Sequence, residues 1–160
     1  MKYGSLVLEK HDFLMIKKFM ELNASLEDYM HKNALEILDG NLEGAIVLQA
    51  DKMPSDIVRL YSQFILTNSS GWREQFELVS PNEVNPKKNK ISVISGLGAS
   101  IIGLSEGDIV KFGVPGNIMM LRLENVQQSG RKITLEVSEN ELKKLFKRNK
   151  DTFLANELES

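Results

Sequence analysis

Three glycines follow an apolar run in the stretch ISVISGLGASIIG, residues 91–103. A strand that leads into closely spaced glycines and then a helix is the pattern of a phosphate-binding loop, in which backbone N–H groups contact the phosphate oxygens. The dinucleotide-binding form requires the spacing G-x-G-x-x-G within a parallel strand–helix–strand unit. Here the spacing is G-x-G-x-x-x-x-G, and no G-K-[ST] ending is present. We therefore expect a packing role, with Gly98 allowing a close approach of the backbone and Gly103 ending a short helix.

Side chains that commonly carry catalysis or bind metals are sparse in this chain. It contains no cysteine, which excludes disulfides, thiolate catalysis and cysteine zinc sites. The two histidines, His11 and His31, have no second ligand at a metal-binding spacing. We therefore expect both to be surface or packing residues, and we expect neither a bound metal nor a cofactor.

The charged residues are nearly balanced, with 20 basic and 22 acidic side chains among 160 residues. The net charge of −2 gives no long-range field that would recruit nucleic acid or an anionic membrane. No apolar run approaches the roughly 20 residues of a membrane span, and the apolar stretch near the N-terminus is too short for a signal peptide. We expect a cytoplasmic protein that neither enters a membrane nor binds DNA in a sequence-specific way.

Two helices are expected in residues 1–52, after a short strand at 6–8. The run EKHDFLMIKKFMEL places Phe13 and Ile16 on one helical face. After the interruption NAS, apolar residues of a second helix recur at three- and four-residue steps: Leu35, Leu38, Leu42 and Ala45. Because the connection is short, we expect an antiparallel helical hairpin with an apolar seam and a tip at residues 23–28.

Strands are expected to dominate residues 53–128. Pro54 ends the helical part because it cannot donate to a helical hydrogen bond. Alternation of apolar and polar residues predicts strands at 58–66 and 72–79, joined by the turn TNSSG, and a third strand at 91–95. The tripeptide PGN predicts a further hairpin turn after a strand that begins with DIV. We expect a small, largely antiparallel sheet with one short helix.

The stretch ISVISGLGASIIGLSEGDIVKFGVPG resembles the C-terminal signature of the Gre transcript-cleavage factors and, more closely, of the Rnk proteins. The run KMPSDIVRLYSQF resembles the start of the first strand of the same domain. The resemblance covers about residues 53–126, with the helical hairpin ahead of it in the right order. It implies an α+β fold in which an antiparallel coiled coil precedes an FKBP-like domain. It also implies docking on bacterial RNA polymerase at the mouth of the secondary channel.

The loop between the third strand and the short helix matches the docking loop of this family. By the resemblance, the polymerase-docking residues are Ser95, Gly96, Leu97 and Gly98. The family usually has proline after the serine, where this chain has Gly96. The alternative interpretation of Leu97 is a side chain of the hydrophobic core.

In full-length Gre factors, acidic residues at the hairpin tip help to hold a catalytic magnesium ion in the polymerase active site. The candidates at the tip of this hairpin are Glu21, Glu27 and Asp28. Carboxylate oxygen is the ligand type that Mg²⁺ prefers. The sequence favours another role, because Ser25 can cap the second helix and the carboxylates can oppose its dipole.

Residues 129–160 are expected to contain a strand, KITLEV, and an amphipathic helix that begins with a capping box at Ser138 and Glu141. Nothing in the resemblance assigns a role to this helix. Its polar surface is crowded with basic residues: Lys143, Lys144, Lys147 and Arg148. They form either a solvated face of a helix packed on the sheet or a patch that faces RNA or polymerase.

The length of the first helix separates the functional alternatives. A helix of about 14 residues rises only about 20 Å, which is much shorter than the arms of the cleavage factors and comparable to those of Rnk. We therefore expect a non-enzymatic transcription modulator that binds RNA polymerase and competes with Gre-type factors without cleaving transcripts. The alternatives are an active Gre-type cleavage factor and a peptidyl-prolyl isomerase with an FKBP-like fold.

Overall fold

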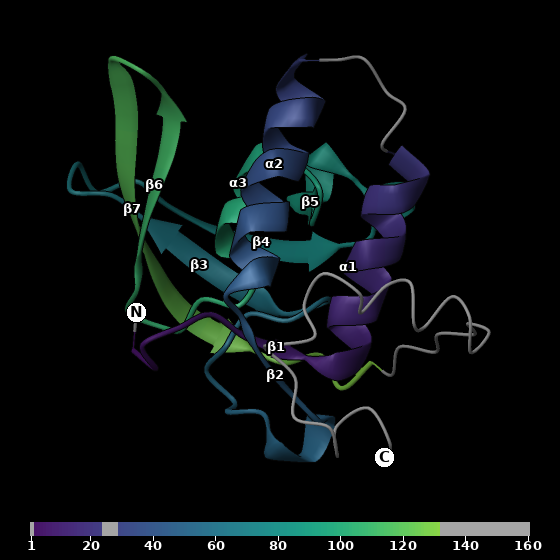
Figure 1. The fold of residues 1–160 in the computed structure, drawn as a ribbon. Coiled ribbons are helices and arrows are strands. Elements are labelled where there is room, and N and C mark those ends of the chain that lie inside the picture. Colours follow the sequence, from purple (N-terminus) through teal and green to yellow (C-terminus); the bar gives the residue numbers. More distant parts are fainter. Residues whose placement is uncertain (1, 24–28, 132–160) are drawn as a thin grey trace.

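The computed structural model describes residues 2–23 and 29–131 of the chain (Figure 1). The helices are α1 (Lys10–Asn23), α2 (Tyr29–Glu43) and α3 (Gly96–Ile101). The strands are β1 (Val7–Glu9), β2 (Ile46–Leu48), β3 (Gln63–Thr67), β4 (Arg73–Val79), β5 (Lys90–Ser92), β6 (Ile109–Val114) and β7 (Asn117–Gln127). Three short 3₁₀ helices are η1 (Ala50–Lys52), η2 (Pro81–Glu83) and η3 (Pro86–Lys88). The strand and helix expected after Gly130 lie outside the described residues.

Five strands form the main sheet, in the order β5-β4-β3-β7-β6. The pairs β3–β4, β3–β7 and β6–β7 are antiparallel, and β4–β5 is parallel. The expected α+β fold with a mostly antiparallel sheet is therefore confirmed. The strands on either side of the glycine stretch, β5 and β6, lie at opposite edges of this sheet. This arrangement differs from the parallel unit of a dinucleotide-binding fold.

A second, two-stranded sheet is formed by β1 and β2, which pair in parallel. The sequence predicts a short strand near β1 but none after the second helix, so β2 is an unexpected element. The N–H of Val7 in β1 also donates to the carbonyl oxygen of Gly103 at 3.3 Å. These bonds attach the N-terminal segment to the turn that follows α3.

The three helices lie on one face of the main sheet, and α1 and α2 run in opposite directions (Figure 1). The predicted apolar face of α1 is buried, as Phe13 and Ile16 have no exposed surface. However, α2 packs mainly against α3, and α1 packs mainly against β1 and β2. The helices share one hydrophobic core with Phe64 and Leu66 of the sheet. The apolar seam expected between the two helices stays a prediction, and Lys17 of α1 lies 3.9 Å from Asp39 of α2.

The first predicted strand, 58–66, is wrong in its first half, because β3 begins only at Gln63. Tyr61 has a φ of 69°, in the left-handed region that a strand does not use. Its N–H donates to the carbonyl oxygen of Leu78 at 2.6 Å. Leu60 is buried in this loop. The alternating pattern in this segment thus reflects a buried loop fixed by hydrogen bonds.

Candidate functional site

The loop that precedes α3 is held by hydrogen bonds between two serines and the backbone. Ser95 is the N-cap of α3, and its Oγ accepts from the N–H of Gly98 at 3.1 Å. The same hydroxyl donates to the carbonyl oxygen of Ser92 at 2.6 Å. Ser92 Oγ in turn accepts from the N–H of Ile94 at 3.1 Å. The backbone of the loop is therefore fixed independently of any proline.

The two glycines singled out in the sequence have the packing roles predicted for them. A Cβ atom at Gly98 would lie 1.9 Å from the carbonyl oxygen of Ser92, so only glycine permits this approach. Gly103 lies two residues beyond the end of α3 and has a φ of +84°. A left-handed residue at this place is the usual way to end a helix.

The surface around this loop is apolar and is bordered by α2 and β6. Leu97 is half-buried and packs against the hydrophobic core, so part of its side chain stays accessible to a partner. A Cβ atom at Gly96 would lie 3.5 Å from the ring of Phe112 in β6. Asn41 in α2 donates to the carbonyl oxygen of Ala99 at 3.1 Å. The loop therefore sits between a helix and a strand that position it.

The β6–β7 hairpin extends this apolar surface. In the register of the two strands, Phe112 lies opposite Met119. Two exposed apolar side chains, Val114 and Met119, lie on the same face of the hairpin as Phe112. Three more lie on its opposite face: Ile109, Ile118 and Met120. All five are 45–58% exposed. Alternation in the sequence predicts the strands but not this exposure, since the same pattern also fits strands buried on one face. An exposed group of this kind often marks an interaction surface.

The other predicted site residues are not brought to this loop within the described structure. Glu21 is exposed in the last turn of α1. Glu27 and Asp28 lie outside the described residues, as do the basic residues Lys143, Lys144, Lys147 and Arg148. Within 2–23 and 29–131, no group of three His, Asp or Glu side chains could hold a metal ion. In the same ranges, no helix has the length and apolar character of a membrane span.

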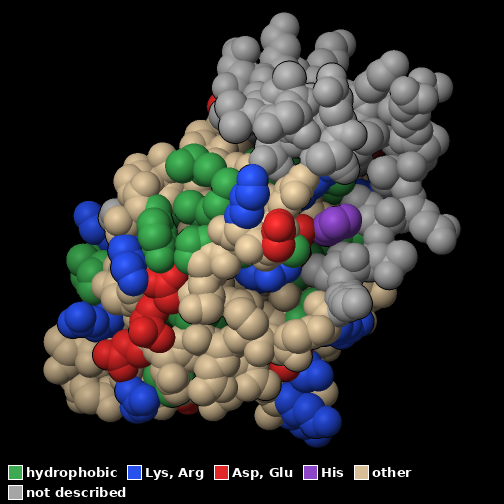
Figure 2. Space-filling view, turned by 90° about the horizontal axis from the view of Figure 1, so that it is seen from below, with side chains coloured by type: hydrophobic (Ala, Val, Ile, Leu, Met, Phe, Trp, Pro, Cys, Tyr) green, Lys and Arg blue, Asp and Glu red, His purple; other side chains and the backbone are tan. Residues whose placement is uncertain are grey.

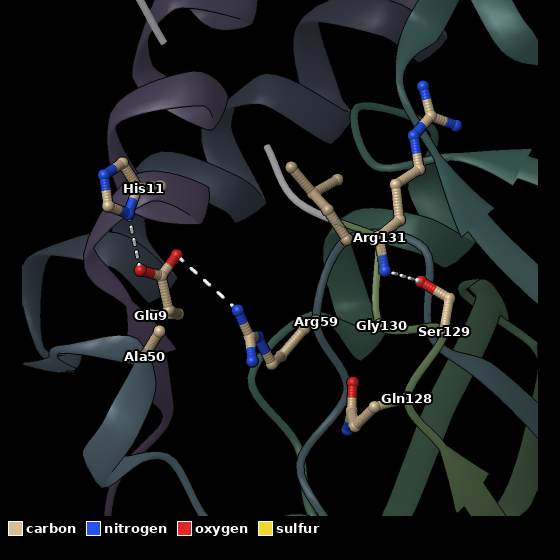
Figure 3. Close-up of a pocket in the computed structure, with 9 residues that line it drawn as sticks. Glu9, His11, Ala50, Arg59, Gln128, Ser129, Gly130 and Arg131 are labelled. Atoms are coloured by element: carbon tan, nitrogen blue, oxygen red, sulfur yellow. Dashed lines mark hydrogen bonds and ion pairs between the residues drawn. The ribbon is translucent and has the colours of Figure 1, made fainter. Parts of the chain in front are cut away.

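A cavity of about 390 Å³ that contains several charged side chains forms a second candidate site, at the contact between the N-terminal segment and the loops that follow (Figure 3). Sequence reasoning missed it. Its polar lining comes from β1, α1, the loop before β3 and the end of β7: Glu9, His11, Arg59, Ser129, Gly130 and Arg131.

Two buried carboxyl groups lie at the N-terminal side of this cavity. Glu9 Oε1 is 2.8 Å from His11 Nδ1, and Glu9 Oε2 accepts from the N–H of Asp12 at 2.9 Å. Asp12 Oδ2 accepts from the N–H of Leu60 at 3.1 Å, and Asp12 Oδ1 has no hydrogen-bond partner in the described structure. Burial and then the charge of Glu9 raise the pKa of Asp12 to about 7, although Arg59 opposes this shift.

One guanidinium group faces both carboxyl groups. Arg59 Nη2 is 3.9 Å from Glu9 Oε2, and Arg59 Nε is 3.7 Å from Asp12 Oδ2. These are ion-pair distances, longer than hydrogen bonds. The spacing of Glu9 and Asp12 across the start of a helix is a capping signal that sequence reasoning could have used. Nothing in the sequence marks Arg59 as their partner, because it lies far away in the chain.

The opposite wall of the cavity is fixed by Arg131. Its guanidinium donates two hydrogen bonds to Glu83, at 2.9 and 3.1 Å, and lies 3.8 Å from the centre of the Tyr61 ring. The bonds from Arg131 and then from Tyr61 lower the pKa of Glu83 to about 2. The charge of Arg131 is therefore already balanced.

The face of the molecule seen in Figure 2 carries acidic, basic and hydrophobic side chains close together, with no continuous area of one charge sign among the described residues. This distribution agrees with the near-balance of charge in the whole chain. A partner on this face would be recognised by mixed contacts rather than by a uniform electrostatic field.

Comparison with known proteins places these features in one family of domains. Residues 53–128 match the family described as transcription elongation factor, GreA/GreB, C-terminal. The chain is 34% identical over 93 residues to transcription elongation factor GreA of Syntrophus aciditrophicus, covering 58% of this chain and 57% of that protein. It is 29% identical over 84 residues to the regulator of nucleoside diphosphate kinase of Escherichia coli, covering 52% and 62%. The chain thus spans less than two thirds of the length of these relatives.

A solved structure gives the same result at the level of the fold. The prokaryotic transcription elongation factor GreA/GreB from Nitrosomonas europaea superimposes with a TM-score of 0.62 at 22% sequence identity, covering 77% of this chain and 99% of that one. The family match includes the loop at 95–98 and the β6–β7 hairpin. Residues 53–128 are therefore similar to the GreA/GreB C-terminal domain in sequence, and the chain is similar to a GreA/GreB factor in fold.

Proposed function

We propose that this protein is a transcription modulator that binds bacterial RNA polymerase through its GreA/GreB C-terminal domain. The observation that carries the proposal is the loop at 95–98, which is held rigidly next to an exposed apolar hairpin. The relatives named transcription elongation factor GreA support this assignment. In the proposal, the domain is FKBP-like and docks at the entrance of the secondary channel, as the sequence resemblance implies.

We further propose that the protein occupies this entrance without stimulating transcript cleavage. α1 contains 14 residues, so it rises only about 20 Å. The apolar faces of α1 and α2 are buried in the core shared with the sheet, which argues against a long arm that projects from the domain. A carboxylate can position Mg²⁺ only through direct or single-water contact. A short N-terminal part would therefore exclude a longer Gre-type factor but contribute nothing to hydrolysis.

Within this proposal the three parts of the chain have different roles. Residues 53–128 dock, and residues 1–52 occupy the channel entrance. Residues 129–160 form an additional part whose basic residues either stay solvated or face the polymerase. We do not extend the proposal to prolyl isomerisation, because the cavity is lined by charged side chains rather than by the aromatic ones that a proline ring would contact.

The experiment that tests docking is the substitution Leu97→Asp, followed by measurement of affinity for purified core RNA polymerase. A desolvated apolar contact does not tolerate a charge, so we expect affinity to fall on the order of tenfold or more. Val84→Asp is the matched control, because Val84 is an exposed apolar residue of the same domain outside this loop. It should bind like the wild type.

Two results would contradict the assignment of Leu97. If Leu97→Asp unfolds, as seen by loss of the cooperative thermal transition, then Leu97 is a core residue. If the variant is folded and binds with unchanged affinity, the loop is not the docking surface.

A further inference from the structure

The guanidinium of Arg59 makes no hydrogen bond of ordinary length to another described residue, and its side chain is 25% exposed. Among the described residues, its neighbours of opposite charge are the carboxylates of Asp12 and Glu9, at 3.7 and 3.9 Å. A guanidinium carries five N–H donors, and largely buried donors are normally paired. Arg59 therefore presents unused donors to the cavity that it lines.

The two acidic neighbours of Arg59 are already engaged with other groups. Both carboxylate oxygens of Glu9 are used, by His11 and by the N–H of Asp12. One oxygen of Asp12 is used by the N–H of Leu60. These bonds hold the acidic groups at the N-terminal side of the cavity. They leave Arg59 free to meet a ligand on its other side.

The opposite wall supplies further donors. In the view of Figure 3, Arg59 lies between Glu9 and the segment that carries Gln128 and Ser129. The N–H groups of Ser129 and Gly130 donate no hydrogen bond within the part of the chain that the structure describes. Gly130 has a φ of +72°, a conformation in which successive N–H groups can turn toward one concavity.

We propose that this cavity binds a small molecule through an oxyanion group, phosphate or carboxylate, held by Arg59 and by the N–H groups of Ser129 and Gly130. The planar fork of arginine matches such groups with two parallel hydrogen bonds. The volume of about 390 Å³ lies in the range of small-molecule pockets, so it has room for more than the oxyanion itself. This site is separate from the polymerase-docking loop and does not depend on it.

The charges around the site make anion binding sensitive to pH. The charged and titratable groups that line it are Glu9 from β1, His11 from α1, Arg59 from the loop before β3, and Arg131, which is balanced by Glu83. Asp12 of α1 lies buried behind this lining, 3.7 Å from Arg59 Nε. When Asp12 is protonated, Arg59 faces one carboxylate instead of two. Because the pKa of Asp12 is about 7, an anion should bind up to about tenfold more tightly at pH 6 than at pH 8.

The test uses the full chain and sodium sulfate, with chloride at equal ionic strength as the reference salt. Sulfate keeps its charge between these two pH values. Nuclear magnetic resonance should show a saturable shift of the Arg59 Nε–H and the Gly130 N–H, with tighter binding at pH 6. In Asp12→Asn, the shift should persist, and the difference in affinity between the two pH values should be smaller than in the wild type. Acetate, used as a second probe, distinguishes a carboxylate site from a phosphate-like site.

A matched pair of variants at the cavity wall tests whether Arg59 binds an anion or only forms ion pairs with Glu9 and Asp12. Ser129 is exposed, and its Oγ accepts from the N–H of Arg131 at 3.1 Å. Both Ser129→Asp and Ser129→Asn keep an acceptor oxygen there, but only the first adds a negative charge. We expect Ser129→Asp to lose sulfate binding at least tenfold and Ser129→Asn to retain it. Absence of a saturable shift with either probe at pH 6, or equal binding by the two variants, would overturn the proposal.

Discussion

The carboxyl group of Asp12 is fully buried beside a second buried carboxylate, Glu9, and one guanidinium faces both. The chemistry of these residues depends on contacts made far along the chain, so it could not be predicted from the sequence. The role of Gly98 could be predicted, because a close approach next to a strand is a local feature. The helix cap at Ser95 is also local, but the sequence led us to Ser95 only as a docking residue.

The pH dependence of stability should report on Asp12. Its pKa is about 7 in the folded protein and 3.8 as its ordinary value, so the folded state binds the proton more strongly. The free energy of unfolding should therefore fall as pH rises from about 4 to 7, by up to roughly 4 kcal/mol, and then stay low. Asp12→Asn should remove this fall. Urea unfolding across this pH range measures it.

Asp51→Asn is the control for this experiment, since Asp51 is an exposed acid in η1 near the same cavity. Its profile should follow that of the wild type. Parallel profiles for the wild type and Asp12→Asn would show that Asp12 titrates in the folded state as it does in the unfolded chain.

A pair of glycine substitutions tests the close packing of Gly98 against the backbone of Ser92. Gly98→Ala places a Cβ atom 1.9 Å from a backbone oxygen, so the loop must shift. We expect a loss of about 1–3 kcal/mol in the free energy of unfolding, as for other overpacked sites. Gly40→Ala in α2 meets no atom within 4 Å and should instead stabilise the protein by about 0.5–1 kcal/mol. Equal effects at both positions would refute the packing role of Gly98.

At the level of elements, the two hairpins could be predicted because strand alternation and turn residues agree. Asn68 accepts from the N–H groups of Ser70 and Trp72 in the turn between β3 and β4, as expected of an Asn-rich turn. The parallel pair of β1 and β2 could not be predicted, since strands of three residues carry little pattern and their pairing is long-range. The same limit applies to the loop before β3. Its apolar residues are buried, so their spacing in the sequence resembles that of a strand.

The backbone conformation at the start of α3 allows a prediction for the substitution Gly96→Pro, which introduces the proline that is usual in the family that this stretch resembles. Gly96 is the first residue of α3, and its preceding residue, Ser95, has a ψ of 162°, which a following proline tolerates. Gly96→Pro should stabilise the fold by about 0.4–1 kcal/mol by restricting the unfolded chain. Affinity for polymerase should stay close to that of the wild type, because hydrogen bonds already fix the backbone of the loop.

Thermal unfolding and polymerase affinity of Gly96→Pro should be measured together. A less stable variant would mean that the backbone at the helix start does not fit proline. A stable variant with weaker binding would mean that docking uses the conformational freedom of Gly96.

At the scale of the whole molecule, the N-terminal helices and residues 53–128, which match the GreA/GreB C-terminal family, share one core. The apolar faces of both helices could be predicted from their periodicity. Their partners could not, because an apolar face does not specify whether it meets another helix or a sheet. The consequence is that α1 and α2 support the residues that carry the proposed docking loop.

The proposed separation of polymerase binding from transcript cleavage is tested most directly on stalled, backtracked elongation complexes. RNA cleavage should be measured with this protein alone and in competition with a full-length GreA. We predict no stimulated cleavage by this protein, and inhibition of GreA-stimulated cleavage in proportion to its polymerase binding, which Leu97→Asp should abolish. Robust cleavage by this protein alone, or polymerase binding without inhibition of GreA, would contradict the account.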